Sequence, residues 1–220
     1  MARPRADDYA DKRAAIHRRA AQTLSEAGGR ASMSRIAEDC GISKALLYHY
    51  YKNRDALISD ILCTHLREID RALAKACEGR AGADRLHCLS RTLLALYEDA
   101  DDLHRLQLGA LGKLPEEDAR RIRTLERVIL DRFRAAIREV APDLDGAGMT
   151  AASMSLMGML NWVFTWFRPG GALTRDEFAR HATDMLLRSL EEAPRENIRR
   201  TEEPCQDVRS VRTKSATARR

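Results

Sequence analysis

The chain has 220 residues, which is long enough to bury a core without disulfide or metal staples. Its net charge is +5, but residues 1–54 carry +5 and residues 193–220 carry +4, so residues 55–192 are acidic at −4. The five cysteines form no CxxC pair, which argues against a zinc site, and the first thirty residues lack the apolar core of a signal peptide. We therefore expect a cytoplasmic protein with reduced thiols packed as small hydrophobic groups, whose basic N-terminal end contacts a polyanion.

Hydrophobic periodicity predicts helices along the chain and no strand, so the fold class is all-α. In the first helix Ile16, Ala20 and Leu24 recur four residues apart until Gly28 ends it. Two short helices follow around Gly41. The later helices are predicted over residues 54–78, 84–99, 101–111, 115–140, 149–167 and 174–192.

The most apolar stretch, residues 149–167, approaches the length of a membrane span. It contains Asn161 and several small polar residues, so we interpret it as a buried helix with no membrane contact. In the next helix, Thr174 and Glu177 have the spacing of a capping box. Residues 193–220 are polar and rich in arginine, which predicts a disordered basic tail.

Residues 32–41 predict the first half of a helix-turn-helix motif. Ser32 can cap the first short helix, and Gly41 permits the left-handed turn that a side chain resists. Ser43 can cap the second helix, which begins at Lys44. Two short helices joined by such a turn place the second helix in the DNA major groove.

The second short helix has a buried side and a free side in this pattern. Tyr51 and either Leu46 or Leu47 are expected to point to the core. On the free side, Ala45 can touch a thymine methyl, while polar and basic side chains can donate to phosphates. The candidate DNA-contacting residues are Ser32, Ser34, Ser43, Lys44, Ala45, Tyr48, His49, Lys52 and Arg54. The pattern also fits an ordinary helical hairpin with a solvated basic face.

The run ISKALLYHYYKNRDAL, residues 42–57, resembles the recognition helix and junction of the tetracycline-repressor (TetR) family, and IAEDCG, residues 36–41, resembles its preceding helix and turn. The resemblance covers residues 8–62. Arg54 and Asp55 stand where the family more often has Lys and Glu, and Tyr51 stands where it more often has Phe.

The resemblance implies about nine helices in two domains, a three-helix DNA-binding domain over residues 1–54 and a ligand-binding and dimerisation domain over residues 55–192. It implies a repressor that binds double-stranded DNA and is released by a small-molecule effector. A two-fold dimer would require a palindromic operator. No cofactor and no metal are expected.

By the same resemblance, the last two long helices should pair with their mates in a homodimer as a four-helix bundle. The first of them is rich in small and flexible apolar residues, which suits close helix approach. The candidate interface residues are Met154, Met157, Phe178, Met185 and Leu186. The alternative is that these side chains form only the core of one protomer.

The run NWVFTWFRPGG, residues 161–171, resembles a branch of the family that responds to acyl-coenzyme A thioesters. We expect Trp162 and Trp166 to share one helix face, with Arg168 at the helix end for a phosphate or carboxylate. Tyr97, His104 and Leu108 lie on helices that line the cavity in this family. The tryptophans also fit a plain core role, and the alternative effector is a drug-like or other small molecule.

An enzyme is not expected, because the chain has no GxSxG, HExxH, P-loop or GxGxxG motif. The remaining alternative is an all-helical adaptor that binds a protein partner. An adaptor would show no sequence preference in a gel-shift assay with competitor DNA.

Overall fold

The computed structural model describes residues 6–28, 30–98, 100–110 and 112–192. These residues form nine α-helices and one 3₁₀ turn, without a strand, which confirms the all-α prediction. The elements are α1 (Ala6–Glu26), α2 (Met33–Asp39), α3 (Lys44–Tyr50), α4 (Arg54–Ala76), α5 (Gly82–Leu96), α6 (Asp101–Ala110), α7 (Glu116–Val140), α8 (Gly146–Asn161), η1 (Val163–Thr165) and α9 (Arg175–Glu192).

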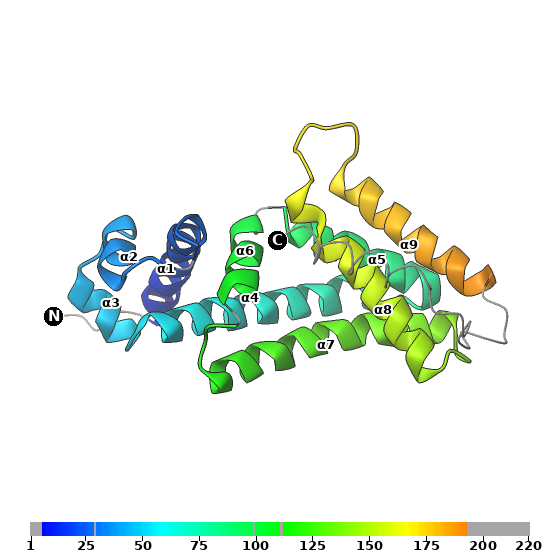
Figure 1. Cartoon of the computed structure of the whole chain (residues 1–220), viewed down its shortest axis with the longest axis horizontal. Helices are drawn as coiled ribbons and strands as arrows, with labels where there is room; N and C mark the ends of the chain where they lie inside the picture. Colours follow the sequence, from blue (N-terminus) through cyan, green and yellow to red (C-terminus); the bar gives the residue numbers. More distant parts are fainter. Residues whose placement is uncertain (1–5, 29, 99, 111, 193–220) are drawn as a thin grey trace, which may run out of the picture.

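The molecule is elongated, with a small helical head at one end and a larger body (Figure 1). Helices α1, α2 and α3 form the head, and α4 runs from the head into the body. There α4 packs along α7, α5 packs on α7 and α9, and α8 packs against α7 and α9. Helix α6 packs on both α1 and α4, so it bridges the head and the body.

The hydrophobic core is continuous through both parts. In the head, Leu24, Ile36 and Leu47 are fully buried between the three helices. In the body, Leu93 on α5 and Phe133 on α7 are fully buried, as the amphipathic spacing of these helices requires. The predicted domain limits at residues 54 and 192 stay predictions. The hydrophobic core runs across the first of these limits.

The predicted helix over residues 149–167 is wrong at both ends. Asp145 caps α8 by accepting a 2.7 Å hydrogen bond from the backbone N–H of Gly148, so the helix begins earlier. It ends at Asn161, and a 3₁₀ turn follows. There the backbone N–H and the hydroxyl of Thr165 both donate to the carbonyl oxygen of Trp162, at 3.1 and 2.7 Å, so the carbonyl that follows the helix end has two donors.

The capping box at α9 is confirmed. The backbone N–H of Thr174 donates to Oε2 of Glu177 at 2.8 Å, and the backbone N–H of Glu177 donates to Oγ1 of Thr174 at 3.1 Å. Within the described ranges, every helix is too short or too polar to cross a membrane. The predicted tail, residues 193–220, lies outside the described residues.

Candidate nucleic-acid interface

The turn between α2 and α3 is a Schellman motif built on Gly41. Its φ is +65°, in the left-handed region that favours glycine. The backbone N–H of Gly41 donates to the carbonyl of Glu38, and that of Ile42 donates to the carbonyl of Ala37, both at 3.0 Å. These two hydrogen bonds terminate α2 and turn the backbone toward the start of α3.

Both short helices are capped as predicted. The Ser32 side chain accepts from the N–H of Arg35 at 3.2 Å, and the Ser43 side chain accepts from the N–H of Leu46 at 3.1 Å. Both serines are exposed, as is Ser34 in the first turn of α2. A capping hydroxyl keeps its own hydrogen, so it can still donate to a phosphate.

Helix α3 has the predicted division into two sides, and the structure decides which leucine is buried. Leu47 is fully buried, whereas Leu46 is 40% exposed and lies on the outer side. The outer side also carries an ammonium group, a methyl group, a phenol and an imidazole, which together offer donors and a small apolar surface. These exposed residues are Lys44, Ala45, Tyr48 and His49.

Two basic residues, Lys52 and Arg54, follow α3 directly in the sequence. Lys52 is exposed, and Arg54 is half-buried with its guanidinium 3.6 Å from a carboxylate oxygen of Asp55. Lys44 extends its ammonium over the ring of Tyr48, 5.9 Å from the ring centre. All nine predicted DNA-contacting residues are therefore at least partly solvent-accessible.

A polar cluster, defined here as Arg13, His17, Tyr51 and Asp60, joins α3 to α1 and α4. Tyr51 is the C-cap residue of α3, and its hydroxyl donates to Oδ2 of Asp60 at 2.9 Å. Nε2 of His17 lies 2.8 Å from that hydroxyl and 3.0 Å from Oδ2 of Asp60. Arg13 donates to both carboxylate oxygens of Asp60. The C-terminal end of α3 is thus fixed to α4, the helix that enters the body.

The polar cluster holds Asp60 ionised. Burial alone would raise the pKa of this carboxyl, but hydrogen bonds from His17, Arg13 and Tyr51 outweigh burial and lower the pKa far below its usual range. Sequence reasoning did not find this cluster, because Arg13 and Asp60 are 47 positions apart. The one available signal was Tyr51, where the family more often has Phe.

The body contains an aromatic cluster that includes three of the predicted effector-binding residues. His104 on α6 packs against Tyr97 after α5, with ring centres 4.6 Å apart, and against Phe164 in η1, at 5.1 Å. Trp162 packs edge-on against Phe164 at 6.1 Å. The Tyr97 hydroxyl donates to Oδ1 of Asn161 at 3.0 Å. Phe164 and Asn161 were missed, since neither has a distinctive local pattern.

Two histidines near this cluster are neutral at pH 7. Burial lowers the pKa of His104. Burial, and repulsion from His104 whenever both rings are protonated, lower the pKa of His65, on α4, to about 4. A neutral aromatic cluster is compatible with an apolar ligand.

The side chain of Leu108, the remaining predicted residue on α6, lies outside the described part of the structure.

The prediction that Trp162 and Trp166 share one helix face is wrong. Trp162 is the C-cap of α8 and Trp166 follows η1, so no continuous helix joins them. Trp162 is 61% exposed, while Trp166 packs edge-on against Phe178 of α9 at 5.0 Å. Arg168 is exposed and follows the 3₁₀ turn rather than an α-helix end.

A partly buried ion pair links α9 to the bridging helix α6. Two carboxylate oxygens of Asp101, at the start of α6, accept from Arg175 at 3.1 and 3.2 Å. The guanidinium of Arg175 also stacks over the ring of Phe167 at 4.8 Å. Because α6 packs on α1, this pair connects the C-terminal helices to the head through one short helix.

The predicted dimer residues divide into three groups by their exposure. Met154 on α8 and Met185 on α9 are 53% and 52% exposed, which is unusual for large apolar side chains. Met157 and Phe178 are half-buried. Leu186 is only 5% exposed and belongs to the core of the protomer, so its assignment to an interface is corrected.

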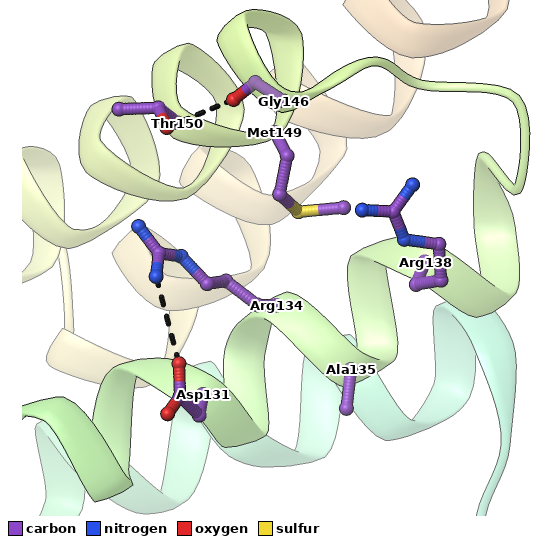
Figure 2. Close-up of a pocket in the computed structure, with 7 residues that line it drawn as sticks. All are labelled: Asp131, Arg134, Ala135, Arg138, Gly146, Met149 and Thr150. Carbon is purple, nitrogen blue, oxygen red and sulfur yellow. Dashed lines mark hydrogen bonds and ion pairs between the residues drawn. The ribbon is translucent and has the colours of Figure 1, made fainter.

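Three cavities in the described residues have none of the predicted effector residues in their linings. Figure 2 shows one of about 530 Å³ between α7 and α8, where Arg134 and Arg138 reach toward the start of α8. Both arginines have partners: Arg138 donates to the carbonyl of Leu144 at 2.7 Å, and Arg134 lies 3.5 Å from Asp131. A second, of about 690 Å³, lies beside the polar cluster between α1, α4 and α6. The third, of about 300 Å³, is lined partly by Cys77.

Comparisons with protein families identify both parts of the chain. The model described as "Bacterial regulatory proteins, tetR family" matches residues 16–61, and "Tetracyclin repressor-like, C-terminal domain" matches residues 79–190. The second match alone covers half of the chain. The protein therefore belongs to the TetR family and is a DNA-binding transcriptional regulator rather than an enzyme.

No curated protein matches the chain. Among the described residues, no cluster of His, Cys, Asp or Glu could hold a metal ion.

Solved structures share the fold. A TetR-family transcriptional regulator from Bordetella parapertussis is 26% identical, with a TM-score of 0.73 over 80% of this chain and 93% of that one. PfmR from Thermus thermophilus is 25% identical, with a TM-score of 0.70 over 79% and 97%. AibR, solved in complex with isovaleryl coenzyme A and operator DNA, is 23% identical, with a TM-score of 0.69 over 80% and 98%.

Proposed function

We propose that this regulator reads a palindromic operator with α3 as a homodimer in the cytoplasm, acting as a repressor that a small-molecule effector releases. The observation that carries the proposal is the outer side of α3, where donors and small side chains are exposed on a helix that Ser43 caps, directly after the Ser32-capped helix α2. A recognition helix needs this combination, because its backbone must approach the bases while its donors contact phosphates.

The DNA-reading surface is tested with Lys44→Ala. The loss of one phosphate contact in each protomer should weaken operator binding at all sequences and reduce the magnitude of the salt slope. The control is Lys113→Ala, an exposed lysine in the loop before α7. Gel shifts with the upstream intergenic DNA give both quantities. Equal operator binding by the two variants would show that Lys44 contacts no phosphate, and binding that unrelated competitor DNA removes would show that α3 does not read a specific sequence.

The homodimer interface is proposed to include Met154, Met157, Met185 and the outer edge of Phe178. Exposed methionines on two adjacent helices are costly in a monomer and adapt well to a partner surface. Met154→Arg should convert the protein to a monomer in sedimentation experiments and abolish operator binding. Val128→Arg, at another exposed apolar position on α7, should leave the dimer intact.

The effector is proposed to be an acyl-coenzyme A thioester that binds near the aromatic cluster of Tyr97, His104 and Trp162. Support comes from the neutral character of that cluster and from the isovaleryl coenzyme A bound by AibR, which shares the fold. Arg168 and Trp166 would take part only after movement of the segment between η1 and α9, because Trp166 packs its ring against Phe167 and Phe178 rather than against the cluster.

A thermal-shift screen tests the effector. A specific acyl-coenzyme A ester should raise the melting temperature more than free coenzyme A does, and Trp162→Ala should reduce the shift. Trp162 is largely exposed, so its removal should leave the fold intact. A screen that is blank for thioesters and positive for planar drugs would favour a multidrug-responsive regulator. The genes that flank this one would indicate the pathway it controls.

A further inference from the structure

Two cysteine thiols meet where α4 ends and α5 begins. Sγ of Cys77 lies 2.8 Å from Sγ of Cys88, and both residues are free thiols. Cys77 is the C-cap residue of α4, and Cys88 is on α5. A disulfide needs an S–S distance of about 2.05 Å, so the two sulfurs have to approach by less than about 1 Å.

The local backbone brings the thiols together. Gly79 and Gly82 both have positive φ, +72° and +52°, and turn the chain back on itself between the two cysteines. The backbone N–H of Arg80 donates to the carbonyl of Cys77 at 3.2 Å and closes this turn. The two thiols therefore face each other without any movement of the long helices.

Each sulfur has a distinct environment. Cys77 is 7% exposed and lines the cavity of about 300 Å³, together with Arg85 and Arg132. Cys88 is more accessible, and its thiol contacts the carbonyl oxygen of Ala76 at 3.3 Å. Burial and the neighbouring Cys88 raise the pKa of Cys77, so its thiol stays protonated and donates to Cys88.

We propose that Cys77 and Cys88 form a redox-active dithiol that a hydroperoxide oxidises to an intramolecular disulfide. The other cysteines of the described residues lack such a partner, since Cys63 is buried in the core and Cys40 contacts the carbonyl of Ile16. Disulfides in reducing compartments are transient and serve redox sensing. Oxidation of this pair would therefore be a second signal to which the regulator responds, besides the proposed effector.

The reaction balances in two steps. The sulfur of Cys88, as thiolate, attacks the terminal oxygen of the hydroperoxide; the O–O bond breaks, an alcohol or water leaves, and Cys88 becomes a sulfenic acid. The sulfur of Cys77 then attacks that sulfur as it gives up its proton; the S–S bond forms, the S–O bond breaks, and water leaves. The two thiols lose two electrons and two protons, and the peroxide is reduced.

The test uses the full chain, which has five cysteines including Cys205 outside the described residues. Reduced protein is treated with stoichiometric hydrogen peroxide, quenched with N-ethylmaleimide, and analysed by intact mass and non-reducing peptide mapping. We expect two alkylatable thiols to disappear, one peptide pair to join Cys77 to Cys88, and dithiothreitol to reverse both changes.

Variants distinguish the pair from general thiol oxidation. Cys40→Ser, a matched half-buried cysteine, should oxidise like the wild type. Cys77→Ser should leave a sulfenic acid on Cys88 that dimedone traps, without a disulfide. The proposal is overturned if the wild type keeps all five thiols, if the linkage involves Cys205 or a second chain, or if Cys88 passes directly to sulfinic acid.

Discussion

Replacing Asp60 with asparagine tests whether the polar cluster holds the DNA-binding head on the body. The substitution keeps the shape of the side chain but removes the charge that Arg13 contacts on both oxygens. It also places an NH₂ group among the donors of His17, Tyr51 and Arg13. Only one acceptor oxygen then remains for donors from three residues.

The expected loss of folding stability at pH 7 is about 2–3 kcal/mol. Hydrogen bonds to charged groups contribute roughly 1.5–3 kcal/mol, and breaking a fully buried ion pair costs about 3–5 kcal/mol. The Asp60 side chain is 24% exposed and that of Arg13 is 40% exposed, so water can partly replace the lost contacts. The expected loss therefore lies below most of the range for a fully buried ion pair. For a chain of this size the loss corresponds to a fall of about 5–10 °C in Tm.

The dependence on pH has a definite sign. The folded-state pKa of Asp60 is lowered, so its stabilisation is present above the unfolded carboxyl pKa of about 3.9 and is lost as pH falls through the folded pKa. The difference between wild type and Asp60→Asn should therefore stay constant from pH 7 to about pH 5 and narrow below about pH 4.

Urea unfolding followed by circular dichroism, at one protein concentration, measures both effects. Asp84→Asn is the matched control, because Asp84 pairs with Arg80 at 2.8 Å on an exposed surface and should change stability by less than about 0.5 kcal/mol. If Asp60→Asn is no more destabilising than Asp84→Asn, or if its effect does not narrow at low pH, the reasoning about the polar cluster is wrong.

Three further substitutions test local features by urea unfolding. Gly41→Ala should cost about 1–2 kcal/mol from φ strain alone, since a Cβ there meets no atom within 4 Å; a neutral result would mean that the turn can relax. Leu47→Ala should cost about 2–5 kcal/mol and Leu46→Ala less than about 1 kcal/mol, and similar losses would contradict the assignment of the buried side of α3. Thr183→Val should cost about 1 kcal/mol, because the Thr183 hydroxyl lies 2.8 Å from Oγ of Ser90 in the buried contact of α9 with α5; an unchanged midpoint would show that this bond adds nothing.

Features that depend on near neighbours in the chain were predictable. The helices follow from apolar residues spaced along one face, and the Ser32, Ser43 and Thr174 caps follow from side chains that bond to backbone within three residues. Gly41 was predictable for the same reason, because the left-handed turn is a property of one residue. The helix-turn-helix motif consists entirely of such local features.

Other features were decided only by the tertiary structure. Apolarity alone did not reveal that α8 stops at Asn161, because the stop depends on Val163 being buried and on Phe164 packing against His104 of another helix. Likewise, the burial of Leu186 beside the exposed Met185 depends on which face of α9 meets α5.

The sequence by itself determined that this chain forms amphipathic helices with a DNA-reading turn, since both are set by interactions within about four residues. Tertiary structure alone decided the joint between head and body and the meeting of Cys77 with Cys88. The hydrogen bonds of the polar cluster join residues up to 47 positions apart, and the contact of the two cysteines joins residues 11 positions apart across a turn. Contacts between residues so far apart form only when whole helices have packed, and the cysteine contact needs α5 to pack against α4 as well as the turn between them. No pattern within one helix encodes either contact.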